Sequence, residues 1–160
     1  MDLKTRKWII NKDVLPYLDD KGYKIVAPRQ KGLPRCIDIQ CEKDGENYFF
    51  SIMVVTPDKK GHCFDATVST EWIEARNRGE NFKFVICCVD SSYQSKIVKI
   101  LEREAVLSYS SPHLTSFQIK MNIKEDEIDN PQIAPKKRMD SLYKMIDEFE
   151  QLKKKYDKKF

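Results

Sequence analysis

A basic stretch in the first quarter of the chain is the clearest candidate for binding chemistry. From residue 21 to residue 35 there is no acidic residue. The basic residues of this stretch are Lys21, Lys24, Arg29, Lys31 and Arg35. Lys and Arg side chains bind nucleic-acid phosphates without reading the base sequence. Lys24, Arg29, Lys31 and Arg35 are therefore candidate nucleic-acid contacts, and a solvated basic loop is the alternative.

Candidate metal ligands are few. His62, Cys63 and Asp65 combine three ligand types within four residues, although a mixed polar turn has the same composition. There is no CxxC pair and only two histidines exist, so a closed zinc site would need ligands scattered along the chain. No Gly-rich phosphate loop, Gly-x-Ser-x-Gly elbow or HExxH pattern is present. Because none of these motifs is present, we expect no bound cofactor.

The end of the chain is predicted to be an amphipathic helix that binds another protein. Apolar residues recur at steps of three and four along residues 140–160. They are Leu142, Met145, Phe149, Leu152 and Tyr156. The preceding segment, residues 124–138, contains two prolines and is typical of a linker. These prolines favour separation of the helix from the rest of the domain. We therefore expect the helix to bind a second copy of the chain or another protein rather than to fold back onto its own domain.

Length and composition indicate one folded domain. The chain has 160 residues, of which 41% are hydrophobic and 34% charged. We expect an α/β domain over residues 1–123, a linker over 124–138 and a basic amphipathic helix over 139–160. From residue 136 onward there are nine Lys or Arg and five Asp or Glu, which leaves 20 of each before that point. The body is therefore neutral, and the net charge of +4 belongs to the tail.

The expected compartment is the cytoplasm. The five cysteines are odd in number and lie mostly in strand-like apolar runs, as reduced thiols do. No apolar run approaches the roughly 20 residues that span a bilayer. The first ten residues lack the apolar stretch of a signal peptide. We expect no membrane association.

The local patterns predict alternating helices and strands. Residues 4–21 have helical periodicity, and β-branched and aromatic runs predict strands at 23–27, 36–41 and 48–56. Gly45 favours a tight hairpin between the second and third strands. Residues 62–68 predict a short strand, 70–78 a helix and 82–89 a central strand covered on both faces. Residues 92–105 are consistent with a helix and 117–123 with a last strand.

In this order of elements, the chain resembles the PD-(D/E)XK nuclease superfamily. That superfamily includes Holliday-junction resolvases and the restriction-endonuclease-like domains of defence systems. The matching text is GYKIVAPRQKGLPRCIDIQCEKDGENYFFSIMVV followed by STEWIEARNRGENFKFVICCVD, so the resemblance covers roughly residues 4–90. It implies an α/β fold with a restriction-endonuclease-like αβββαβ core, a mixed central sheet and, here, an added C-terminal helix.

The resemblance also implies a metal site that this chain has largely lost. In the superfamily, an Asp on one hairpin strand and an acidic-x-Lys triplet on the next hold a divalent cation that activates water. Asp38 stands where that Asp would be, and it could equally be a structural strand-end residue. The next strand reads Ser51-Ile52-Met53 and offers no such triplet. Glu71 and Glu74 are possible replacements, although first-turn glutamates usually complement the helix dipole.

Three functions remain open. The first is a catalytically silent nuclease-like domain that binds nucleic acid or a partner protein, in a defence, repair or mobile-element setting that the resemblance alone suggests. The second is an active nuclease with relocated ligands, which would need Mg²⁺ or Mn²⁺. The third is a protein-interaction module built on the terminal helix. The missing triplet favours the absence of enzymatic activity.

Overall fold

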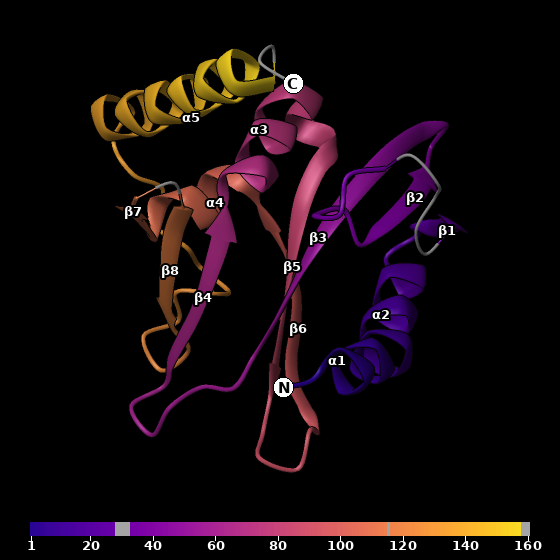
Figure 1. The fold of residues 1–160 in the computed structure, drawn as a ribbon. Coiled ribbons are helices and arrows are strands. Elements are labelled where there is room, and N and C mark those ends of the chain that lie inside the picture. The colour runs from indigo at the N-terminus through magenta and orange to yellow at the C-terminus, as the bar shows by residue number, and fades with distance from the viewer. Residues whose placement is uncertain (28–32, 115, 158–160) are drawn as a thin grey trace.

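The main sheet has five strands in the order β1-β2-β3-β5-β6 (Figure 1). The computed structural model describes residues 1–27, 33–114 and 116–157. Within them, β3 and β5 run parallel and the other neighbouring strands of this sheet are antiparallel. The strands are β1 (Lys24–Ala27), β2 (Ile39–Lys43), β3 (Glu46–Val55), β5 (Phe82–Val89) and β6 (Ser95–Glu102).

Helices cover both faces of this sheet. The first helical segment comprises α1 (Leu3–Ile9), a π-helical turn (Ile10–Val14) and α2 (Leu15–Asp20), and α3 spans Ser69–Arg78. Ile9 and Leu18 cluster with Val85 of β5, whereas Trp72 of α3 clusters with Phe84 of the same strand. Because successive strand residues point to opposite faces, β5 is buried on both. The almost unbroken apolar run of residues 82–89 predicted this position.

The predicted fold class is confirmed. The order is helix, three strands, helix, strand, with β4 (His62–Val68) inserted between β3 and α3. The predicted hairpin joins β2 to β3 through Asp44 and Gly45, whose φ angles of 53° and 79° are both positive. Such a two-residue turn matches the twist of the flanking strands. The chain is thus a mixed α/β protein with a mixed five-stranded sheet and a C-terminal helix.

A second, smaller sheet was not anticipated. It has the order β4-β8-β7, with β8 at Ser116–Asn122 and β7 at Ser110–His113. Residues 62–68 and 117–123 were predicted as strands, and their antiparallel pairing is new. The smaller sheet lies to one side of the main sheet, and α1 and α2 lie to the other (Figure 1).

The helix expected over residues 92–105 is wrong. This segment forms β6 followed by the short helix α4 (Arg103–Ser108). The side chain of Asp90 accepts hydrogen bonds from the backbone N–H groups of Ser92 and Gln94, which turns the chain back along β5. The edge of β5 then supplies backbone partners for β6, and this pairing overrides the helical spacing of the apolar residues.

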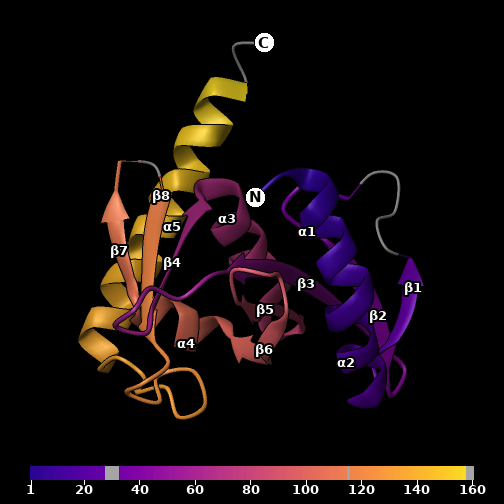
Figure 2. The same ribbon diagram turned by 90° about the horizontal axis from the view of Figure 1, so that it is seen from below.

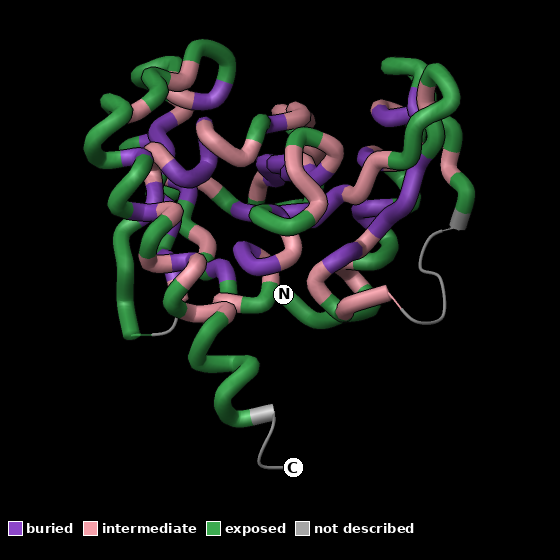
Figure 3. Tube along the Cα trace, turned by 90° about the horizontal axis from the view of Figure 1, so that it is seen from above, coloured by how far each residue is buried: buried purple, intermediate pink, exposed green. Residues whose placement is uncertain are grey.

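The C-terminal helix folds back onto the domain, so the expected separation is wrong. α5 (Lys136–Asp157) buries Leu142 and Ile146, and Met145 and Phe149 pack against the same core. Leu152 and Tyr156 of the predicted seam are exposed, in turns that extend away from the rest of the chain (Figures 2 and 3). Partner binding through that end of the helix stays a prediction.

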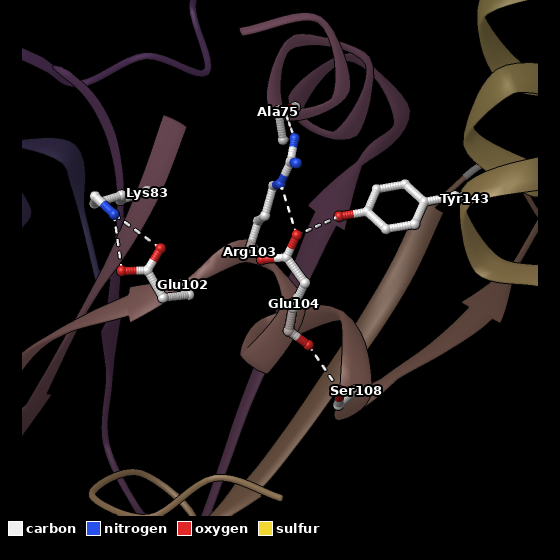
Figure 4. Close-up of polar contacts among 7 residues, drawn as sticks. All are labelled: Ala75, Lys83, Glu102, Arg103, Glu104, Ser108 and Tyr143. Atoms are coloured by element: carbon white, nitrogen blue, oxygen red, sulfur yellow. Dashed lines mark hydrogen bonds and ion pairs between the residues drawn. The ribbon is translucent and has the colours of Figure 1, made fainter. Parts of the chain in front are cut away.

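Polar contacts help fix α5 in place (Figure 4). The hydroxyl of Tyr143 donates to Glu104 Oε1 at 2.9 Å, and the same oxygen accepts from Arg103 Nε at 3.0 Å. Arg103 Nη1 also donates to the carbonyl of Ala75 in α3 at 2.8 Å. α3, α4 and α5 are therefore joined through one arginine and one glutamate.

All five cysteines are free thiols, as their number and setting predicted. Four of them are buried and Cys36 is partly exposed. No helix in the described parts of the chain combines the length and apolar character that crossing a bilayer requires.

The docking of α5 predicts unequal effects of truncating its apolar residues. Ile146→Ala should lower the free energy of unfolding by about 2–5 kcal/mol, because it empties a fully buried site. Leu152→Ala is the matched control and should change it by less than about 0.5 kcal/mol, since Leu152 is 47% exposed. Urea denaturation followed by circular dichroism measures both. Equal, small effects would mean that α5 does not pack on the core in solution.

Candidate functional site

Three acidic and two basic side chains line one cavity of about 320 Å³. The acids are Asp38, just before β2, Asp65 of β4 and Glu71 of α3. The bases are Arg6 of α1 and Arg35, in the segment before β2. Four residues of β3 form part of the wall, namely Ser51, Ile52, Met53 and Val54. The cavity therefore lies where the first helix, the hairpin, β4 and the second helix meet.

Asp38 and Arg6 form the central contact of this cavity. Arg6 Nη1 donates to Asp38 Oδ1 at 3.3 Å, and Nη2 donates to Oδ2 at 3.2 Å. Nη2 also donates to the carbonyl oxygen of Ile52 at 2.7 Å. Asp38 Oδ2 accepts from the backbone N–H of Ile52 at 2.7 Å. The carboxylate is thus held by β3 and by α1, and only 21% of its side chain is exposed.

Glu71 of α3 is hydrogen-bonded to Ser51 of β3 at the wall of the cavity. Its Oε2 accepts from the hydroxyl of Ser51 at 2.8 Å, and its Oε1 accepts from the backbone N–H of Val68 at 3.2 Å. Burial raises the pKa of Glu71 to about 7, against the lowering effect of these hydrogen bonds, and the charges of Asp65 and Asp38 raise it further. Glu71 is therefore a carboxyl group that gains or loses its proton near neutral pH.

Asp65 belongs to the same cavity and to no cluster with His62 and Cys63. Successive residues of β4 face opposite sides, so Asp65 points away from the side of His62. His62 lies 3.5 Å from the carboxylate of Asp58, and Cys63 is buried with its Sγ 3.7 Å from that of Cys88. The structure thus disperses the possible ligand cluster. Burial is also the main cause that raises the pKa of Asp65.

The cavity does not fit the catalytic cation that the resemblance implies. The carboxylate of Asp38 and the carbonyl of Ile52 are hard oxygen donors of the kind that Mg²⁺ prefers. Both are bound instead by the guanidinium of Arg6. Met53, on the β3 wall of the cavity, is buried and carries no charge. Among the described residues, no three His, Cys, Asp or Glu side chains lie close enough together to hold a metal ion.

The other predicted site residues are dispersed. Glu74 pairs with Arg78 at 2.9 Å and does not line this cavity. Lys24 is exposed on β1, opposite Glu42. Arg35 is exposed at the cavity, whereas Arg29 and Lys31 lie outside the described residues. Asp38, Glu71 and Arg35 are therefore the predicted residues that the fold brings together.

Arg6 is the central residue that the sequence reading missed. Its contact with Asp38 joins residues 32 positions apart, which no local pattern records. One signal was present: Arg6 lies three residues before the buried Ile9, so a helix places it on the inward side. A basic residue on the buried side of a helix needs an acidic partner.

Comparison with known proteins gives a structural likeness and no match in sequence. No family model matches the chain, and no curated protein matches it. Solved structures do match, among them a Holliday junction resolvase from the archaeal hyperthermophile Archaeoglobus fulgidus. That match has 16% sequence identity and a TM-score of 0.41, and it covers 73% of this chain and 91% of the resolvase. At this level the resolvase's activity cannot be carried over.

The raised pKa of Glu71 predicts a pH-dependent stability. A carboxyl group whose pKa is raised by folding stabilises the protein fully below its ordinary value of 4.5, and this contribution is lost as pH rises through about 7. Glu71→Gln removes this titrating group. The free energy of unfolding of the variant, relative to that of the unmodified protein, should therefore rise between pH 4.5 and 7. The upper limit is about 3 kcal/mol, since one pKa unit corresponds to about 1.4 kcal/mol.

Urea denaturation at several pH values measures this difference. Glu148→Gln, at an exposed position of α5, is the control and should leave the profile unchanged. Parallel profiles for the Glu71→Gln and unmodified proteins would contradict the assignment.

Proposed function

We propose that this chain is a nuclease-like domain in which Arg6 has replaced the catalytic cation and which binds nucleic acid without cutting it. The observation that carries the proposal is the triple contact of Arg6 with both carboxylate oxygens of Asp38 and with the Ile52 carbonyl. A guanidinium keeps its charge throughout the physiological pH range and matches a carboxylate with two parallel hydrogen bonds. The guanidinium of Arg6 therefore stays hydrogen-bonded to these oxygens throughout that pH range.

The chemistry that remains in the cavity does not replace the missing metal. A cation would have to displace Arg6, because both positive charges would compete for the same oxygens. Glu71 is engaged by Ser51 and Val68. With no metal and no lysine on this part of β3, two groups of the described wall could stabilise the extra negative charge of a phosphate under attack. They are Arg6, whose guanidinium is already bound, and Arg35.

Support for nucleic acid as the partner comes from charge. Arg35 is exposed at the cavity and Lys24 is exposed on the strand that leads into the same segment. Arg29 and Lys31, between them in sequence, add two more positive charges. Such residues bind the phosphate backbone and carry no sequence information. A role in a defence, repair or mobile-element system is part of this proposal and follows from the family resemblance.

The proposal predicts that the purified protein does not cleave DNA or RNA with Mg²⁺ or Mn²⁺. It also predicts that Arg6→Ala binds Mn²⁺ more tightly than the unmodified protein, because the Asp38 carboxylate and the Ile52 carbonyl become free. The double variant Arg6→Ala with Asp38→Asn is the control and should lose that gain. Electron paramagnetic resonance of free Mn²⁺ measures binding, and circular dichroism checks folding. Cleavage by the unmodified protein that disappears in Asp38→Ala would establish the active-nuclease alternative instead.

The basic segment predicts a salt dependence. If Arg29, Lys31 and Arg35 contact phosphates, replacing all three by alanine should flatten the slope of log affinity against log salt by roughly 2 to 3. A matched triple of exposed lysines, Lys59, Lys60 and Lys96 to alanine, should leave the slope nearly unchanged. Fluorescence anisotropy with a labelled oligonucleotide at several salt concentrations measures it. An equal slope for the basic-segment variant and the unmodified protein would remove this segment from the interface.

A further inference from the structure

The outer side of α1 and of the π-helical turn that follows it is basic and carries an exposed tryptophan. Its exposed positions fall in adjacent pairs along one side of α1 and the π-helical turn. They are Leu3, Lys4, Lys7, Trp8, Asn11 and Lys12, which we call the α1 stripe. The stripe contains three lysines and no acid. It continues directly from the cavity, because Leu3 and Arg6 of the same helix line the cavity wall.

Trp8 is in an unusual environment for a tryptophan. It is 50% exposed, whereas Trp72, the other tryptophan of the chain, is completely buried. Lys12 Nζ lies 4.7 Å from the centroid of the Trp8 ring, so the ring takes part in a cation–π contact. A large aromatic surface that stays in water beside lysines is a feature of stacking platforms for nucleic-acid bases.

Lys4 and Lys7 are available to an anionic ligand. Among the described residues, no carboxylate pairs with either of them, whereas Lys12 lies 3.1 Å from the carboxylate of Asp13. Asp2, the nearest acid before the stripe, accepts a hydrogen bond from the backbone N–H of Thr5 as the cap of α1. The positive charge around Trp8 is therefore only partly compensated.

The positive charge of the α1 stripe favours a polyanion over a second copy of the chain as its ligand. A second copy of the chain docking by a twofold axis would bring the lysines of one stripe against those of the other. A polyanion would be attracted by these lysines, whereas two facing stripes would repel each other. Trp8 adds a further requirement, because stacking needs a base whose face is free, and the bases of a duplex are stacked on one another. A single strand meets both conditions.

We propose that the α1 stripe binds single-stranded nucleic acid, with phosphates on Lys4 and Lys7 and a base stacked on Trp8. This inference rests on the proposed function and specifies its ligand. From Lys4 to Lys12 the stripe is about 12 Å long at 1.5 Å per residue. A strand lying along it passes the cavity between Arg6 and Arg35. Arg35, exposed at the cavity, is then a second contact for the same strand.

The two tryptophans make the test direct. The full chain is titrated with a short oligothymidylate, and intrinsic tryptophan fluorescence is recorded. Stacking on Trp8 should quench the emission, whereas the buried Trp72 should not respond. Trp8→Phe should keep most of the affinity and lose the quenching. Trp8→Ala should weaken binding about tenfold or more, in line with base stacking on an aromatic ring. Lys4→Ala with Lys7→Ala should weaken binding and reduce its salt dependence.

The possible failures are distinguishable. One outcome is that oligothymidylate binds without quenching the fluorescence and that Trp8→Ala keeps its affinity. The α1 stripe would then not be the binding site, while the proposed function would be unaffected. Quenching by a duplex as strong as by the single strand would overturn the single-strand assignment. Shielding of Trp8 from iodide that grows with protein concentration alone would assign the stripe to a second copy. No binding of any nucleic acid would overturn both this inference and the proposed function.

Discussion

The ion pair between Arg6 and Asp38 is the contact on which the arrangement around the cavity depends. It joins α1 to the start of β2, and both residues also bond to the backbone of Ile52 in β3. The N–H of Ile52 donates to Asp38 and its carbonyl accepts from Arg6, so the pair completes the hydrogen bonding of that peptide position. Removing one partner would leave the other charge half-buried and alone, which costs more than the intact pair contributes. Asp38 therefore has a structural role, because it links the start of β2 to α1 and to β3.

This pair also sets the electrostatics of the other acids. Asp65 and Glu71 face the same cavity, but the guanidinium is already engaged by Asp38. Burial therefore dominates their pKa values and raises both. Near neutral pH, Glu71 is partly protonated, so the cavity is less negative than three carboxylates would suggest. The basic residues at its edge, among them Arg35, are correspondingly less compensated, as an approaching polyanion requires.

The parts of the fold that could be predicted are those that local chemistry determines. Asp44 and Gly45 dictate the hairpin, and the apolar run of β5 identifies a strand buried on both faces. The elements that were predicted wrongly depend on contacts with segments that are distant in sequence. Residues 95–102 form a strand because the edge of β5 is free to pair, and α5 folds back because the core presents an apolar surface to Leu142 and Ile146. Periodicity shows that a segment has an apolar side and does not say what covers it.

The same limit applies to the candidate site. Asp38 and Glu71 could be found from sequence because they occupy the expected elements, and Asp65 was a candidate only through its neighbours His62 and Cys63. Arg6 could not be found, because its partner Asp38 is 32 residues away in sequence. The two amphipathic helices make a related contrast. α5 was expected to bind a partner and instead packs Leu142, Ile146 and Phe149 against the core, while α1 leaves Trp8 in water among lysines. Burial of Trp8 would have required a neighbouring element over the α1 stripe, and three lysines there make such packing costly to desolvate. The charge that keeps this side of the helix open is also what suits it to a polyanionic partner.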